Sequence, residues 1–155
     1  MSASPSRRRI AAAASPEVAS RSVDIQVRWS DSDPAGIAFY PTFFEWYDIA
    51  CAALFDGIGL PWPTLFPERG IVGVPIVECG SRFTAPVRWG DTITVTATVA
   101  WVKEKMFRVE YAVSVGDRAC ATGFEVRAWV GRPAAPGEPL RALPLPADVA
   151  AKLAS

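Results

Sequence analysis

The sequence predicts an α+β domain made of one antiparallel sheet and one long central helix. Several segments alternate apolar and polar side chains, as strands with one buried face do. Residues 41–56 are instead apolar around most of a helical circumference, which is typical of a helix that other elements surround. The length of 155 residues allows one domain with a substantial core and is too short for two ordinary domains.

The first predicted strand, residues 23–29, leads through a loop into the helix. Residues 30–36 consist of Ser, Asp, Pro, Ala and Gly, a composition typical of loops. Pro41 suits the first position of a helix, where its missing N–H loses no bond, and Gly57 suits the stop. Asp48 lies at the border between the narrow polar stripe of this helix and an apolar face, which is an unusual place for a carboxylate.

Four further strands are predicted after the helix. They cover residues 75–84, 92–101, 107–115 and 120–130, with a tight hairpin turn at residues 116–117. A sheet that curls around a single helix leaves its outer face and one edge uncovered. Trp89 and Trp129 are expected to point outward there and to favour a homodimer or a larger assembly.

The two ends of the chain differ from the domain between them. Residues 1–22 are rich in Ala, Ser and Arg, and we expect a disordered tail; an organelle transit peptide has a similar composition. The folded domain is expected to cover residues 23–131. Residues 132–155 form a Pro/Ala-rich C-terminal strap, with a last helical turn near residues 147–153.

Composition excludes several classes of function. Lys plus Arg and Asp plus Glu number 16 each, so the chain lacks the excess of basic residues that is typical of nucleic-acid-binding proteins. No apolar stretch is long enough to predict a membrane span. Three cysteines without CxxC spacing favour a reducing compartment, and we expect a cytoplasmic protein in which Cys51 and Cys79 are core residues. Histidine is absent, which excludes Ser-His and Cys-His pairs, and neither a metal nor a cofactor is expected.

The loop before the helix is the strongest candidate for chemistry. Asp33 precedes a proline and is therefore held extended, and it lies beside a helix start whose N–H groups can polarise a carbonyl. Because Pro41 lacks an N–H, the amide of Tyr40 is the natural donor. A carboxylate at such a place can act as nucleophile or as general base. Alternatively, Asp31, Ser32 and Asp33 are only turn formers and caps.

Residues 31–48, DSDPAGIAFYPTFFEWYD, resemble the signature of the 4-hydroxybenzoyl-CoA thioesterase family. Residues 68–77, ERGIVGVPIV, are similar to the segment after the central helix in the branch of that family specific for 4-hydroxybenzoate. The similarity covers about residues 23–131. It implies a hotdog fold, in which an antiparallel five-stranded sheet wraps around the long central helix. It also implies the branch in which aspartate works without histidine.

The resemblance assigns roles to particular residues. It implies that Asp33 is the catalytic carboxylate and that the Tyr40 amide polarises the carbonyl of the substrate. Asp48 is similar in position to the residue that receives the phenol hydroxyl of a 4-hydroxybenzoyl group. Alternatively, Asp48 is a structural residue that a neighbouring strand or a partner subunit satisfies.

Other residues of the two motifs are also expected at the site. Phe39, Glu68 and Gly73 are expected to bind substrate, although Glu68 could equally make a surface ion pair with the arginine that follows it. Lys103 and Lys105, on a hairpin tip, resemble the place where the family binds the CoA phosphates; charged hairpin tips are otherwise simply solvated.

The sequence therefore predicts an acyl-CoA thioesterase that hydrolyses an aromatic acyl-CoA, foremost 4-hydroxybenzoyl-CoA, to the free acid and CoA in aromatic degradation. The family resemblance implies sites at a dimer interface, hence a homodimer or homotetramer. Two alternatives remain. One is a thioesterase for other aryl or for aliphatic acyl-CoA or acyl-carrier-protein substrates, and the other is a non-catalytic hotdog module that binds acyl groups.

Overall fold

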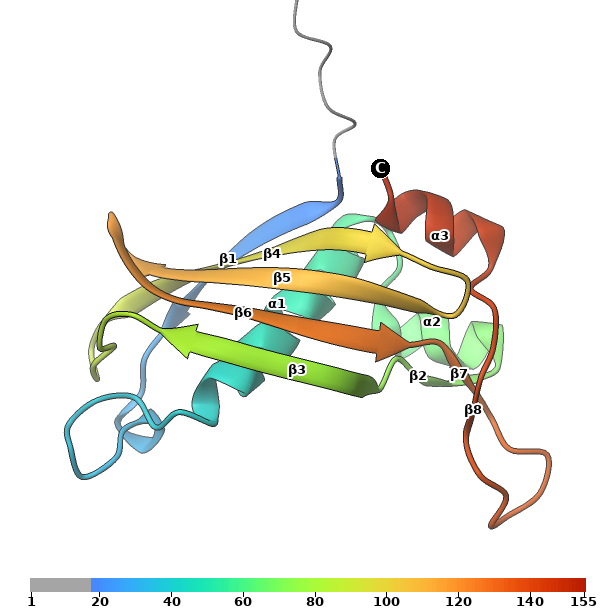
Figure 1. Ribbon diagram of the computed structural model, residues 1–155, viewed down its shortest axis with the longest axis horizontal. Coiled ribbons are helices and arrows are strands. Elements are labelled where there is room, and N and C mark those ends of the chain that lie inside the picture. Colours follow the sequence, from blue (N-terminus) through green and yellow to red (C-terminus); the bar gives the residue numbers. More distant parts are fainter. Residues whose placement is uncertain (1–17) are drawn as a thin grey trace, which may run out of the picture.

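The computed structural model describes residues 18–155, and its first element is the strand β1, Ser20–Gln26 (Figure 1). Most of the predicted tail lies outside the described residues, but its last three residues belong to this strand, so the predicted boundary was wrong there. The hydroxyls of Ser20 and Ser22 lie 2.9 and 2.7 Å from those of Thr98 and Thr96 on the next strand. Such cross-strand pairs stabilise a polar edge that composition alone had suggested to be disordered.

The main sheet has five antiparallel strands in the order β1-β4-β5-β6-β3. The other four are β3, Ile76–Phe83; β4, Thr92–Val102; β5, Met106–Val115; and β6, Arg118–Ala128. The predicted strands are present with ends shifted by one or a few residues, and the predicted hairpin turn joins β5 to β6. The predicted hotdog arrangement is confirmed.

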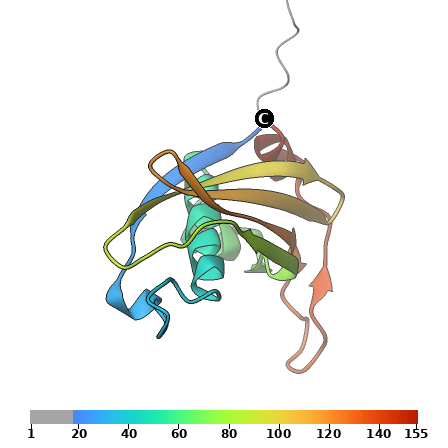
Figure 2. The same cartoon turned by 60° about the vertical axis from the view of Figure 1, so that its left-hand side comes forward.

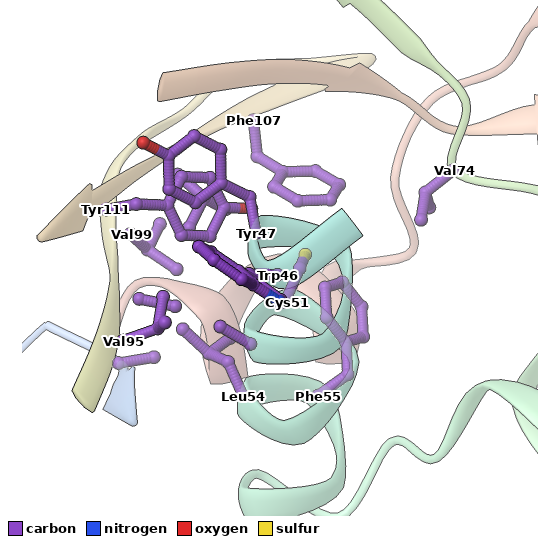
Figure 3. Packing of buried hydrophobic residues seen from close by; sticks show 14 of the residues in the cluster. Trp46, Tyr47, Cys51, Leu54, Phe55, Val74, Val95, Val99, Phe107 and Tyr111 are labelled. Atoms are coloured by element: carbon purple, nitrogen blue, oxygen red, sulfur yellow. The ribbon is translucent and has the colours of Figure 1, made fainter. Parts of the chain in front are cut away.

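The sheet curls around helix α1, Thr42–Gly57, which runs along its concave face (Figure 2). The large buried side chains of α1 meet the inward side chains of β4 and β5 (Figure 3). Tyr47 stacks on Tyr111 of β5 with ring centroids 4.5 Å apart. Tyr47 also lies against the backbone of β6, where a Cβ on Gly123 would come within 2.5 Å of its ring, so only glycine fits this position.

A second helix and a small second sheet contribute side chains to this core. The second helix, α2, Trp62–Arg69, was not predicted; Pro63 lies in its first turn, where proline is tolerated, and Pro67 lies inside it. A small second sheet joins β2, β7 and β8 in that order. These strands are Ile71–Gly73, Val130–Gly131 and Arg141–Ala142.

The strap packs on the domain and ends in α3, Ala147–Leu153, at the predicted helical turn. Leu153 is fully buried. The expectation that Trp129 points outward is wrong, because the strap runs along it and the Leu143 N–H donates to the Trp129 carbonyl at 2.8 Å. Trp89 is exposed, as expected. Among residues 18–155 no single helix is long and apolar enough to cross a membrane; the bent pair of α1 and α2 passes that test only in combination.

Candidate active site

The loop between β1 and α1 fixes the carboxylate of Asp33. The Asp33 N–H donates to the Ile37 carbonyl at 2.9 Å, and the Gly36 N–H donates back to the Asp33 carbonyl at 3.0 Å. Oδ1 of Asp33 accepts a hydrogen bond from the Ala35 N–H at 2.8 Å, which makes an Asx turn. Oδ2 accepts no hydrogen bond from residues 18–155. The side chain therefore forms the turn and still has one oxygen available.

Asp31 has a structural role. It is buried, and its carboxylate accepts hydrogen bonds from the Arg28 backbone N–H at 2.7 Å and the Arg28 guanidinium at 3.1 Å. This capping box closes a short 3-10 helix, η1, Trp29–Asp31. The hydrogen bond to Asp31 raises the pKa of Arg28 above its ordinary value. The alternative that these residues are caps therefore holds for Asp31, while Oδ2 of Asp33 accepts no hydrogen bond from residues 18–155.

The N-terminus of α1 leaves one backbone donor open. The N–H groups of residues 42–44 donate to carbonyls three residues earlier, at 2.9, 3.3 and 3.0 Å. Pro41 has no N–H. The Tyr40 N–H has no acceptor among the described residues, and it lies where the partial positive charge of the helix is concentrated.

Asp33 and Tyr40 line the same pocket, which has a volume of about 480 Å³. Its walls are mostly apolar and come from the loop, the start of α1 and the segment after β3: Ile37, Ala38, Phe43, Phe83, Thr84, Ala85, Pro86 and Val87. A thioester carbonyl in this pocket would have a backbone donor and a carboxylate in the same lining. That pairing is the chemical requirement for acyl transfer.

A second hollow lies on the other side of Asp33. Its volume is about 580 Å³ and its lining includes Trp29, Arg88 and Trp89. The two indoles make an edge-to-face pair with centroids 5.2 Å apart. Trp29 is the last residue of the first predicted strand, but it lies outside β1 and is 71% exposed, because the chain leaves the sheet after Gln26 and turns into η1.

Asp48 lies apart from this pocket, on the surface of α1. Its side chain is 56% exposed, and Oδ1 accepts a hydrogen bond from Nη2 of Arg127 at 2.6 Å. Oδ2 accepts none from residues 18–155. A neighbouring strand therefore supplies a partner for Asp48, as the structural alternative required, and one oxygen remains open.

Arg127 belongs to a buried polar cluster beneath α1. Its Nε and Nη2 donate to Oε2 of Glu125 at 3.0 and 2.8 Å, and its Nη1 donates to the Val74 carbonyl at 3.1 Å. The Tyr111 hydroxyl donates to the same Oε2 at 2.6 Å. Burial lowers the pKa of Arg127, but Cys51 and the Glu125 and Asp48 carboxylates outweigh it, so the pKa is raised.

Sequence reasoning missed this cluster, although a signal was present. Glu125 and Arg127 stand two residues apart in a predicted strand, so both share one face. They pair with Val109 and Phe107 of β5, which belong to the core, and this face is therefore the buried one. Two opposite charges at alternating inward positions indicate a buried ion pair.

Gly73 lies near the Arg127 side chain. Both line a hollow of about 360 Å³ together with Trp62, Phe66, Val72, Val74, Pro75 and Leu140. Gly73 has φ of 149°, and a Cβ there would lie 3.3 Å from the Phe66 ring. Glu68 is exposed at the end of α2 and does not line this hollow. Arg69, the expected ion-pair partner of Glu68, binds Asp148 of α3 instead.

Phe39 and the two lysines lie elsewhere in the single chain. Phe39 is exposed beside Tyr40, with ring centroids 5.3 Å apart, and lies outside the Asp33 pocket. Lys103 and Lys105 are on the exposed tip between β4 and β5, and Nζ of Lys103 lies 4.5 Å from the Trp101 ring centroid.

The part of the chain that the structure describes contains neither an activated cysteine nor a cluster of metal ligands. Cys51 is buried without a neighbouring base, and burial raises the pKa of its thiol to about 12. Cys79 is exposed on β3, so the expectation that it is a core residue was wrong. No group of three or more Cys, Asp or Glu side chains within residues 18–155 is arranged to hold a metal ion.

A sequence profile described as the thioesterase-like superfamily matches residues 27–153. The chain belongs to this superfamily. It is 36% identical over 136 residues to a 4-hydroxybenzoyl-CoA thioesterase from Pseudomonas sp. (strain CBS-3), with 83% of this chain and 94% of the relative covered. The predicted family and thioester hydrolase activity are confirmed.

Two solved structures of the superfamily are similar to this one. A 4-hydroxybenzoyl-CoA thioesterase, solved as an aspartate-to-asparagine variant complexed with 4-hydroxybenzoyl-CoA, has a TM-score of 0.79 and 30% identity, with 88% of this chain and 100% of that chain covered. A gentisyl-coenzyme A thioesterase has a TM-score of 0.73 and 29% identity, with 86% and 98% covered.

Proposed function

We propose that this thioesterase hydrolyses an aromatic acyl-CoA, with 4-hydroxybenzoyl-CoA as the preferred substrate, in the cytoplasm as part of aromatic degradation. The observation that carries the proposal is that Asp33 and Tyr40 line one mostly apolar pocket, and that the Tyr40 N–H has no acceptor among the described residues. The relatives that act on 4-hydroxybenzoyl-CoA and gentisyl-CoA support an aromatic acyl group.

In this proposal the thioester carbonyl oxygen accepts a hydrogen bond from the Tyr40 N–H. Negative charge that develops on this oxygen is stabilised by that donor and by the helix dipole. Asp33 then acts through its free Oδ2. Either this oxygen attacks the carbonyl carbon, the C–S bond breaks and water hydrolyses the resulting anhydride, or Asp33 removes a proton from a water that attacks directly. Both routes release the carboxylic acid and the CoA thiol.

Asp48 is proposed to accept a hydrogen bond from the 4-hydroxyl of the acyl group. Its Oδ2 is open, and the hollow that Gly73 and Arg127 line offers the stacked rings of Trp62 and Phe66 to an aromatic group. Phe39 and Glu68 are proposed to border the acyl group, and Lys103 with Lys105 to contact the CoA phosphates.

The single chain separates these residues, and we propose that a second copy unites them. β3 is an edge strand with exposed Ile76, Val77 and Phe83. Phe83, at one end, lines the Asp33 pocket, while Ile76, at the other end, pairs with Arg127. Antiparallel pairing of two β3 edges would therefore bring the Asp33 pocket of one copy beside the Asp48 region of the other.

Two measurements test the proposal. Release of free CoA thiol from a panel of thioesters should be fastest with 4-hydroxybenzoyl-CoA and slower with gentisyl-, benzoyl- and aliphatic acyl-CoA. A preference for an aliphatic chain would contradict the aromatic assignment, and no hydrolysis of any thioester would indicate a binding module. Sedimentation at low micromolar concentration should show a dimer or tetramer, and a fully active monomer would exclude a shared site.

A further inference from the structure

The Arg127 guanidinium is nearly saturated by fixed partners. It has five N–H donors, of which two reach Glu125, one reaches the Val74 carbonyl and one reaches Asp48. Its side chain is only 5% exposed, so it does not move freely between solvent and protein. The guanidinium therefore presents one donor to Asp48 from a rigid, buried position.

Glu125 is the group that fixes this position. Its side chain is fully buried, and a carboxylate there requires a positive partner because an uncompensated buried charge is strongly unfavourable. The Tyr111 hydroxyl, on β5, also donates to Oε2 of Glu125, and Tyr111 is itself held by its stack against Tyr47 of α1. Tyr47 in turn shares a hydrogen bond of 2.6 Å with the Ser81 hydroxyl on β3.

Asp48 depends on this cluster for its orientation. On an exposed helix surface an aspartate side chain samples several rotamers. The bond to Arg127 selects one of them, in which Oδ1 is occupied and Oδ2 is open. An ion pair with one half-exposed member contributes little to stability, so its main effect is on geometry.

We propose that Arg127 is a positioning residue for acyl-group selectivity: held by Glu125 and Tyr111, it orients the Asp48 carboxylate toward the hydroxyl of the substrate. The inference rests on the proposed role of Asp48 as the hydroxyl acceptor. It adds a specificity determinant that lies 79 residues away from Asp48 in the chain.

The test compares two thioesters that differ by one hydroxyl, 4-hydroxybenzoyl-CoA and benzoyl-CoA. Arg127→Lys retains the charge but lacks the planar fork that binds Glu125 and Asp48 together. The ratio of kcat/KM for the two thioesters should fall about tenfold, with the loss confined to the hydroxylated substrate. Equal losses on both thioesters would mean that Arg127 only supports the fold, and would overturn the inference.

Arg108→Lys is the matched control. Arg108 pairs with Glu110, two residues away, and its guanidinium lies over the Phe124 ring. Its side chain is more exposed than that of Arg127 and makes no contact with Asp48. The control should leave the ratio unchanged. Tyr111→Phe is the second variant, in case Arg127→Lys does not fold: it removes one donor to Glu125 and should lower the ratio by about two- to threefold. An unchanged ratio in Tyr111→Phe and in any folded Arg127→Lys would refute the inference.

A double-mutant cycle separates this inference from the proposed function. Asp48→Asn should lower the ratio by itself, and adding Arg127→Lys should then produce no further change. If Asp48→Asn lowers the ratio and Arg127→Lys does not, the positioning role fails while the role of Asp48 stands. If Asp48→Asn leaves the ratio unchanged, the role of Asp48 fails first. A further decrease in the double variant would show that Arg127 acts independently of Asp48, against the proposal.

Discussion

Asp33 lies in the loop before α1 and Asp48 lies on α1 itself, and their carboxylates are oriented in different ways. The hydrogen bonds that Asp33 itself makes all lie within residues 33–37, so its immediate sequence forms the turn that orients its carboxylate. Asp48 lies on α1 and takes its orientation from Arg127, which follows 79 residues later on β6. One carboxylate is set by local structure and the other by tertiary structure.

This difference predicts which substitutions affect each carboxylate. A change within residues 33–37, none of which is buried, acts on Asp33 directly and replaces no core side chain. A change anywhere in the Tyr111, Glu125 and Arg127 cluster acts on Asp48 at a distance and also alters a buried ion pair. We therefore expect catalytic rate to follow the loop, and acyl-group selectivity to follow the core.

The largest effect is expected from Asp33→Asn, which retains the shape of the side chain but removes its charge. The proposed reaction depends on that charge in the transition state, so kcat should fall by at least about a hundredfold on every thioester while substrate binding is largely retained. Steady-state kinetics with Asp56→Asn, an exposed aspartate in the last turn of the same helix, provides the control. Near-normal turnover of Asp33→Asn would remove this residue from the mechanism.

Asp48→Ala should produce a smaller and selective effect. Loss of the acceptor should reduce kcat/KM for 4-hydroxybenzoyl-CoA by about tenfold or more and that for benzoyl-CoA by less than about twofold. Glu45→Ala, at an exposed position of the same helix, should change neither value. If both thioesters lose equally, Asp48 is structural, and the comparison between the two carboxylates loses its functional meaning.

The stability of the core around α1 should decrease at alkaline pH, because it buries the Cys51 thiol. Burial raises the pKa of Cys51 from 9.0 to about 12, so the unfolded chain loses this proton at lower pH than the folded one. The contribution of Cys51 to stability is therefore fully present below pH 9 and is lost between pH 9 and 12, by roughly 1 kcal/mol at pH 10.

Denaturant unfolding at pH 8 and pH 10 measures this loss. Burial also raises the pKa values of Tyr47 and Tyr111, which adds to the loss in the same direction. Cys51→Ala should therefore reduce the dependence on pH without abolishing it. Cys79→Ala, at the exposed cysteine, should leave that dependence as it is. An identical pH dependence in Cys51→Ala and the unmodified protein would contradict the assignment.

The smallest effect is expected from Pro34→Ala. Proline restricts the residue before it, so its replacement gives the Asp33 backbone more freedom while every hydrogen bond of the loop can still form. The free energy of unfolding should fall by ~0.4–1 kcal/mol, and the added freedom of Asp33 should lower kcat by no more than about fivefold. The ratio between 4-hydroxybenzoyl-CoA and benzoyl-CoA should not change. A change in that ratio would show that the loop also contributes to selectivity.

The same difference explains what could be predicted from the sequence. Alternation located β4 and β5, and the loop with Asp33 and Tyr40 was recognised because its geometry depends on neighbouring residues. The exposure of Trp29 and the burial of Trp129 were not predicted, since each depends on where a distant segment passes. The pair of Arg127 and Asp48 was not predicted for the same reason, since 79 residues separate them; only the spacing of Glu125 and Arg127 was a local signal.

The late position of the strap has a consequence for the order in which the protein folds as it is synthesised. Val149 and Leu153 belong to the core, so the surface of β4 and its neighbours that α3 covers stays open until these residues have been made. The strap also holds the hairpin tip, because the Leu145 N–H donates to the Glu104 carbonyl at 2.8 Å. The tip that carries Lys103 and Lys105 therefore gains its last backbone contact only after most of the domain has been synthesised.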